Sequence, residues 1–207
     1  MGRIIFATAC LVLIAFSLQA QTPDNEKKNR SIGLCYSSFG ESDVFRFNGL
    51  EGEGNYAVDK FFTIGLCYIG SINKWLEFET GVDYSKYTVL ITPSFIPDMS
   101  ISSRKENFSI VSIPLTLRAN FLKFIFVNGG VFIDVDGTKS PIDSQTGIGS
   151  LFGIGAKYDF KCGGSIFINP YFKLHALLPF SSNNNQQKLY ESGVRVGLTY
   201  NLTKLRK

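Results

Sequence analysis

Residues 75–86 read Trp-Leu-Glu-Phe-Glu-Thr-Gly-Val-Asp-Tyr-Ser-Lys, and the apolar side chains recur at alternate positions. One phase carries the apolar residues between Leu76 and Tyr84, whereas the other carries three carboxylates. A repeat of two residues is the period of a β-strand with one apolar face, and it does not fit the 3.6-residue period of an amphipathic helix. This stretch therefore predicts a strand.

The same alternation recurs from residue 31 to the end of the chain and predicts an all-β protein. The eight predicted strands are 31–39, 60–70, 74–88, 107–119, 123–135, 146–160, 164–177 and 189–202. Tight turns at 71–73, 120–122 and 161–163 alternate with the longer connections 40–59, 89–106, 136–145 and 178–188. An even number of strands with short turns on one side and long loops on the other is typical of an eight-stranded antiparallel, up-and-down transmembrane β-barrel.

The composition excludes several other classes. Of the 207 residues, 44% are hydrophobic, 14% are aromatic and only 18% are charged, with a net charge of +4. Such a chain is too apolar for intrinsic disorder. Its charge is too small and too dispersed for a nucleic-acid-binding surface.

The N-terminus has the features of an export signal. Residues 1–20 combine Arg3, an apolar stretch and a small residue, Ala20, at the expected cleavage site. The apolar stretch of roughly 13 residues is too short for a helical membrane span, which needs about 20. We therefore expect a signal peptide at 1–20, a flexible leader at 21–30, the barrel at 31–202 and a basic tail at 203–207.

Alternation alone fits two kinds of barrel, because the apolar phase can face a ligand inside or lipid outside. A water-facing exterior would need many charges, but the polar phase here is rich in glycine and thinly charged. The apolar phase is therefore expected to face lipid, in the outer membrane of a Gram-negative bacterium. Five tyrosines in this phase are expected near the membrane interface: Tyr36, Tyr68, Tyr84, Tyr158 and Tyr200. Pro114 predicts a bulge or a weakened pairing site.

The polar phase predicts a set of charges inside the barrel. These candidates are Glu77, Glu79, Asp83, Asp134, Arg118, Lys157, Lys173 and Arg195. In a narrow lumen they must pair, because an unpaired buried charge is costly. Cys35 and Cys67 share this phase on consecutive strands and are candidates for a disulfide. His175, the one histidine, is expected to point into the lumen; no spacing of Cys or His predicts a metal site.

Three strands also resemble a known family. Val111-Ser-Ile-Pro-Leu-Thr-Leu-Arg118, Gly153-Ile-Gly-Ala-Lys-Tyr158 and Val196-Gly-Leu-Thr-Tyr200 are similar to strands of the PorT-like small outer-membrane β-barrels of Bacteroidota, which are related in architecture to the OmpA transmembrane domain. The resemblance covers the chain after residue 20 and implies an outer-membrane location. Its eponymous member assists protein secretion, although most members have no assigned role. The chain departs from the family's aromatic C-terminus, since it ends Asn-Leu-Thr-Lys-Leu-Arg-Lys207.

These observations predict a monomeric barrel without enzymatic activity, cofactor or metal. Its role would be structural or at the cell surface, including help in secretion or envelope assembly. The expected partners are outer-membrane lipid and lipopolysaccharide, the barrel assembly machinery, and a surface partner bound by the apolar loop 89–106. Two alternatives stay open: a periplasmic lipocalin-like carrier of an apolar ligand, and a lipid hydrolase that uses His175.

Overall fold

The computed structural model describes residues 29–45, 55–92, 103–121, 123–138, 140–180 and 187–203. The expected signal peptide, residues 21–28 of the leader, residues 93–102 of the apolar loop and residues 204–207 of the tail lie outside this part of the chain. No helix within the described ranges is long and apolar enough to cross a membrane.

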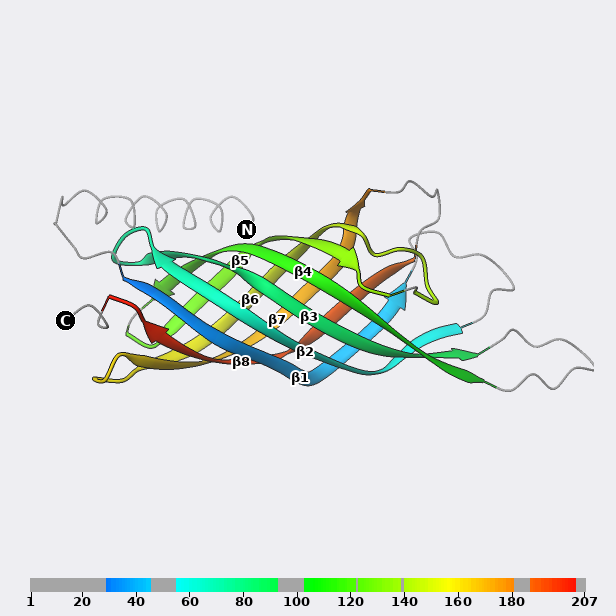
Figure 1. Ribbon diagram of the computed structural model, residues 1–207, viewed down its shortest axis with the longest axis horizontal. Coiled ribbons are helices and arrows are strands. Elements are labelled where there is room, and N and C mark those ends of the chain that lie inside the picture. The colour runs from blue at the N-terminus through cyan, green and yellow to red at the C-terminus, as the bar shows by residue number, and fades with distance from the viewer. Residues whose placement is uncertain are drawn as a thin grey trace, which may run out of the picture.

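Eight antiparallel strands form a closed barrel in sequence order, and β8 pairs with β1 (Figure 1). The strands are β1 (Arg30–Phe45), β2 (Asn55–Ser71), β3 (Leu76–Thr92), β4 (Arg104–Phe121), β5 (Ile125–Asp136), β6 (Gly147–Asp159), β7 (Gly164–Pro179) and β8 (Lys188–Asn201). Closure pairs the first and last strands and removes the free sheet edges at the ends of the chain. The predicted fold class is confirmed.

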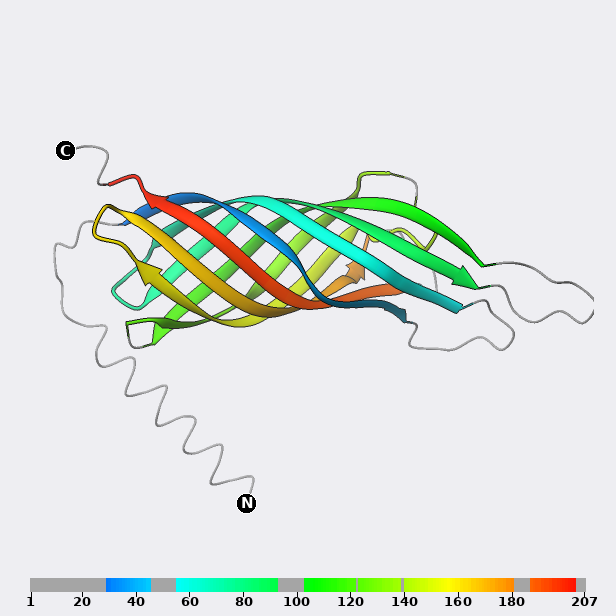
Figure 2. The same cartoon turned by 90° about the horizontal axis from the view of Figure 1, so that it is seen from below.

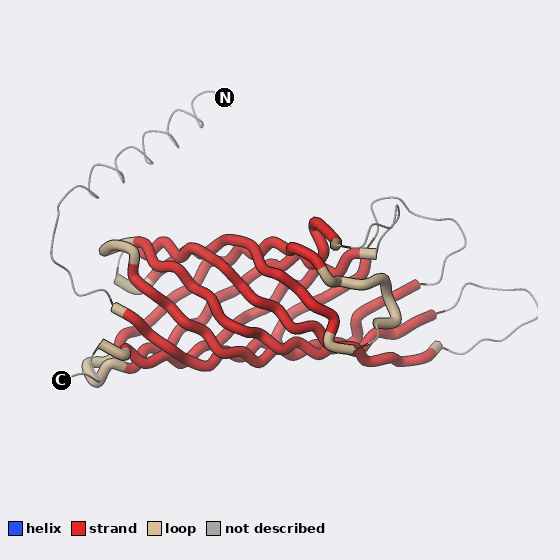
Figure 3. The backbone as a smooth tube through the Cα atoms, turned by 45° about the horizontal axis from the view of Figure 1, so that its top comes forward, coloured by secondary structure: helices blue, strands red, loops and turns tan. Residues whose placement is uncertain are grey.

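The two ends of the barrel differ, as the tube in Figure 3 shows. At one end, which we call the turn end, short connections join β2 to β3, β4 to β5 and β6 to β7. The first strand begins and the last strand finishes here, where the Leu202 amide donates to the Arg30 carbonyl at 2.7 Å. The opposite end, the loop end, carries the four longer connections.

The predicted apolar phase faces outward. Leu34, Leu115 and Phe152 are each about 60% exposed, at 59%, 60% and 61%. Four of the five predicted interface tyrosines are also exposed: Tyr36, Tyr84, Tyr158 and Tyr200. A continuous exposed apolar surface on a closed barrel is the arrangement expected against lipid.

The strands continue past this apolar band toward the loop end, which corrects the predicted connection 40–59. Gly40–Phe45 belongs to β1, and the residues from Asn55 to Asp59 belong to β2. The reason is that the pattern inverts there. On β3 the outward positions change from Tyr84 to Lys86 and Thr88, while the inward positions become Tyr87, Val89 and Ile91. A search for one apolar phase therefore ends β1 to β4 too early at the loop end, whereas the predicted bounds of β5 to β8 agree with the structure within two residues.

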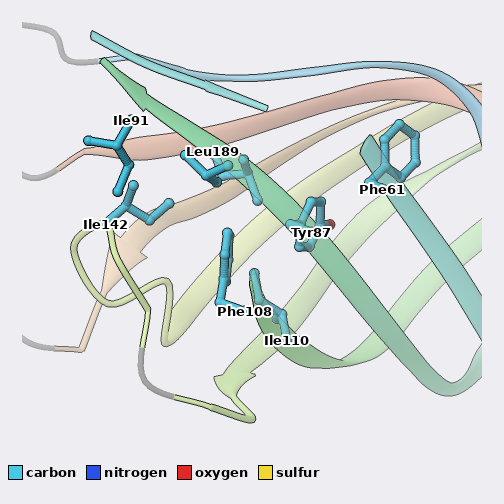
Figure 4. Packing of buried hydrophobic residues seen from close by; sticks show 8 residues of the cluster. Phe61, Tyr87, Ile91, Phe108, Ile110, Ile142 and Leu189 are labelled. Atoms are coloured by element: carbon cyan, nitrogen blue, oxygen red, sulfur yellow. The ribbon is translucent and has the colours of Figure 1, made fainter. Parts of the chain in front are cut away.

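Inward-facing side chains near the loop end of the strands, together with Ile142 of the connection between β5 and β6, form an apolar cluster, shown in Figure 4. Its buried members are Phe61, Tyr87, Val89, Ile91, Phe108, Ile110, Ile142 and Leu189. Tyr87 stacks on both Phe61 and Phe108, with ring centroids 6.1 and 5.1 Å apart. We call this set the loop-end cluster; it packs the barrel interior beneath the loops.

Pro114 weakens pairing without creating a bulge. Pairing between β3 and β4 stops between Thr80↔Leu115 and Asp83↔Ser112 and resumes in the same register. On the other side, Pro114 pairs regularly with Phe132 of β5. Proline lacks the amide hydrogen needed for the ladder, and the missing pairs with β3 are the consequence.

Candidate functional site in the barrel lumen

The centre of the lumen contains a carboxylate held by two arginines. Glu79 on β3 accepts from Arg118 Nη2 of β4 and from Arg195 Nη1 of β8, both at 2.6 Å. Glu79 and Arg118 are almost completely buried, and Arg195 is 5% exposed. The bond to Arg118 joins the adjacent strands β3 and β4. The bond to Arg195 crosses the lumen, because β8 and β3 are separated by β1 and β2.

Glycines make room for this centre. The Arg118 guanidinium carbon lies 4.1 Å from the centroid of the Phe126 ring and 4.7 Å from that of Phe167. A Cβ added at Gly155 would overlap the Phe126 ring, and one added at Gly197 would overlap the Phe167 ring. The small residues thus leave space for two aromatic rings, which stabilise the cation by cation–π contacts.

Two further ion pairs lie on either side of this centre along β3. Lys157 Nζ contacts Glu77 Oε1 at 3.2 Å toward the turn end, where both side chains are partly exposed. On the other side of the centre, toward the loop end, Lys173 Nζ lies 3.7 Å from Asp83 Oδ2, and both side chains are buried. With Glu79, Arg118 and Arg195, these pairs place seven of the eight predicted lumen charges in direct contact with an opposite charge.

The remaining predicted charge, Asp134, pairs with His175. Its Oδ2 lies 2.7 Å from His175 Nδ1, and its Oδ1 accepts from Ser112 Oγ at 2.5 Å. The other ring nitrogen, Nε2, lies 3.4 Å from Tyr87 Oη and 4.0 Å from Glu191 Oε2. His175 therefore points into the lumen, between two carboxylates from different strands.

Three members of this network were missed at the sequence level. Glu191 accepts hydrogen bonds from the hydroxyls of Tyr87 and Tyr171 and is completely buried. Its position four residues before Arg195 places it in the same inward phase. Tyr87 likewise continues the phase of Asp83. The alternation places all three in the inward phase of the predicted strands 74–88, 164–177 and 189–202, so it could have identified them.

Cys35 and Cys67 are neighbours on the lumen face, and the structure has them as free thiols. Their sulfur atoms are 2.9 Å apart, and both residues are buried. This separation is longer than a disulfide bond of about 2.05 Å. Arg195 Nη2 lies 3.1 Å from Cys35 Sγ, which connects the pair to the Glu79 centre. Cys162, in the predicted tight turn, is exposed.

The His175 arrangement lacks the geometry of a hydrolase. In such a site the histidine contacts the nucleophile and the carboxylate contacts the histidine. Here Ser112 donates to Asp134 instead, and the second ring nitrogen faces Tyr87 and Glu191. His175 and Asp134 have no exposed surface. No cluster of three or more metal-ligating side chains occurs in the described ranges.

Comparisons with known proteins bear on the fold. No protein-family model matches the chain, and no curated protein matches it. Among solved structures it is similar to outer membrane protein AlkL, determined by solid-state NMR in DMPC lipid bilayers, with a TM-score of 0.53, 12% identity and coverage of 88% of this chain and 94% of that one. It also matches the translocator domain of autotransporter NalP from Neisseria meningitidis, with a TM-score of 0.36, 11% identity and coverage of 96% of each chain. The likeness to AlkL shows that the chain has the fold of an outer-membrane β-barrel.

Proposed function

We propose that the protein is a monomeric, non-enzymatic barrel of the Gram-negative outer membrane that presents its loop end to a partner at the cell surface. One observation carries the proposal: apolar side chains face outward around the barrel, while ion pairs cross its centre and the loop-end cluster packs its interior at the loop end. An interior packed in this way leaves no wide channel through the described strands. The loop end is then the part available for interaction outside the membrane.

The loop end also presents an ordered, charged surface. β2, β3 and β4 reach beyond the other strands there (Figure 1). Lys105 contacts Asp59 at 2.9 Å, and Arg104 contacts Glu106 at 3.0 Å, on the outside of this extension. An ordered, charged platform above an apolar band suits recognition of a surface partner. The resemblance to PorT-like barrels favours a partner in secretion or envelope assembly.

The lipocalin-like alternative is less consistent with this arrangement. A carrier in water would need its apolar phase inside, but that phase is exposed on every strand. The hydrolase alternative would need an accessible nucleophile beside His175, and the groups around this histidine are buried. The non-enzymatic proposal agrees better with both observations.

Cell fractionation tests the location directly. The protein is expected in the outer-membrane fraction, soluble only with detergent, and migrating faster on a gel before heating than after it. Cleavage at the loop end by protease added to intact cells would support its exposure at the surface. Release of the protein into plain buffer would contradict the proposal. Comparison of secreted proteins between a deletion strain and its complemented parent then tests the secretion role.

A further inference from the structure

The barrel wall contains a slit between β1 and β2. The two strands pair regularly up to Ser37↔Thr63 and again at Asp43↔Ala57. Between these positions residues 38–42 of β1 and 58–62 of β2 have no pairing with each other, although the register is the same on both sides. Figure 2 shows β1 bending away from β2 on the way to the loop end. The slit is therefore closed at both ends and open in the middle.

Each rim of the slit contains one bulge, and the two bulges lie toward opposite ends of the slit. Ser38 is the extra residue of β1 relative to β8, because the register shifts between Ser37 and Phe39. Asp59 is the extra residue of β2 relative to β3, where the register shifts between Val58 and Lys60. A bulge bends its strand and interrupts the ladder. One bulge in each rim explains why the strands separate and why their register is restored beyond the slit.

Glycine permits the bend in β1. A Cβ added at Gly40 would overlap the backbone of Ser192 on β8. β1 therefore approaches β8 more closely than a side chain would allow while it leaves β2. Ser38 Oγ donates to the Phe61 carbonyl at 3.4 Å across the slit, near the end closest to Ser37.

A hollow of about 790 Å³ lies over this slit, at the edge of the apolar band. Tyr36 and Phe62 line it on the apolar side, where both are exposed. Charges of both signs line the rest: Glu41, Asp43, Asp59, Lys60 and Lys86. The hollow thus combines unpaired strand edges, aromatic rings and mixed charge in one place.

We propose that the slit is a docking site for an extended peptide segment of a partner protein, which adds as a short strand to its free edge. The inference rests on the proposed surface-interaction role and names the kind of partner and its place of contact. Peptide addition to an exposed sheet edge gains affinity from main-chain hydrogen bonds. Backbone groups of residues 38–42 and 58–62 that do not pair across the slit can form such bonds with a peptide. The acyl chain of a lipid has no hydrogen-bonding group to offer them.

The size and charge of the hollow favour a peptide over a lipid headgroup. A residue in a packed strand occupies about 160 Å³, taken as its rise times the strand and sheet spacings, so five residues need about 800 Å³. The hollow has about this volume, and each rim has five residues that do not pair with the opposite rim. A site for a phosphate-bearing headgroup would be expected to offer a cluster of cations. Here Lys60 and Lys86 share the hollow with three carboxylates.

Photocrosslinking of the refolded full chain in lipid nanodiscs tests this docking. The probe is an alternating Thr-Val peptide of about seven residues with a photoreactive group, and its control is the same peptide N-methylated at alternate amides. Glu41→Cys/Asp59→Cys provides a disulfide that closes the slit. Asp43→Cys/Ala57→Cys places the same bond where the strands already pair. Both pairs carry Cys162→Ser, which removes the exposed native thiol.

The peptide is expected to label residues 38–42 or 58–62. In the oxidised Glu41→Cys/Asp59→Cys variant the labelling yield should fall at least about tenfold, and reduction should restore it. The matched pair should keep it, and the N-methylated peptide should not label. Equal labelling by the N-methylated peptide, or no effect of closing the slit, would overturn the proposal. If a photoreactive lipid labelled the slit and prevented labelling by the peptide, the site would be assigned to lipid and the proposal overturned. Gel migration before heating verifies each barrel, and fractionation tests the membrane location separately.

Discussion

At the scale of single residues, Glu79 is a fully buried carboxylate held between two guanidinium groups. Glu79→Gln keeps the shape but leaves Arg118 and Arg195 without their carboxylate. Breaking a buried ion pair by removing one partner typically costs about 3–5 kcal/mol. We expect a loss of this order in the free energy of unfolding, measured by urea titration of the refolded barrel in detergent.

The exposed pair Arg104–Glu106 provides the matched control for that variant. Glu106→Gln removes the same charge at the surface, where an ion pair contributes about 0–1 kcal/mol. The two Glu→Gln variants should therefore differ by several kcal/mol. A similar small effect for both would mean that water reaches the Glu79 centre and screens its charges.

A second residue-scale prediction concerns Cys35 and Cys67. Their thiols lie 2.9 Å apart on adjacent strands, and the periplasm favours oxidation. We propose that a dithiol–disulfide oxidoreductase of the periplasm oxidises them as the barrel assembles: the two thiols lose two protons and two electrons, and the oxidant's disulfide becomes a dithiol. Protein purified without reductant should yield one linked peptide pair by mass spectrometry. Alkylation of Cys35 and Cys67 in the unfolded, unreduced protein would contradict this prediction, with Cys162 as the internal control.

At the scale of an element, β4 crosses the boundary between the apolar band and the loop-end extension. Leu115 and Asn107 both face outward on this strand, one within the band and one beyond it. Leu115→Arg is expected to destabilise the barrel by about 2–4 kcal/mol, the cost of a cation near the bilayer midplane. Asn107→Arg should cost about 1 kcal/mol or less, because this position lies near or beyond the interface. Equal unfolding free energies of the two variants in lipid vesicles would disprove the assigned boundary.

The same boundary explains which parts of the strands could be predicted from the sequence. Period-two alternation identifies a strand wherever one face is apolar, so Leu76–Tyr84 and its counterparts were found. Beyond Lys86 the apolar residues change to the inward phase, and the loop-end extensions of β1 to β4 were missed. The slit could not be predicted, because it depends on bulges at Ser38 and Asp59 in strands that pair with different neighbours. Register between strands is not visible in the alternation of one strand.

At the scale of the whole molecule, the interior changes in character along the barrel axis. Glu77 and Lys157 are partly exposed at the turn end, and the Glu79 centre follows as a buried group. His175 and Glu191 lie beyond it, next to Tyr87, which also belongs to the loop-end cluster. Among the described residues, polar contacts near the turn end thus give way to buried apolar side chains at the end that carries the longer connections.

The packed interior of the described strands predicts that the protein does not conduct ions. Eight-stranded barrels have interiors that side chains just fill, whereas porins of 16–18 strands leave a water channel. Purified protein in a planar lipid bilayer should therefore give no stepwise current, while a porin under the same conditions should conduct. The inserted protein must be shown to be folded, by its faster migration on a gel before heating. Reproducible current steps from the folded protein would require the Glu79 centre and the loop-end cluster to open together, and would replace the surface-interaction role with a transport role.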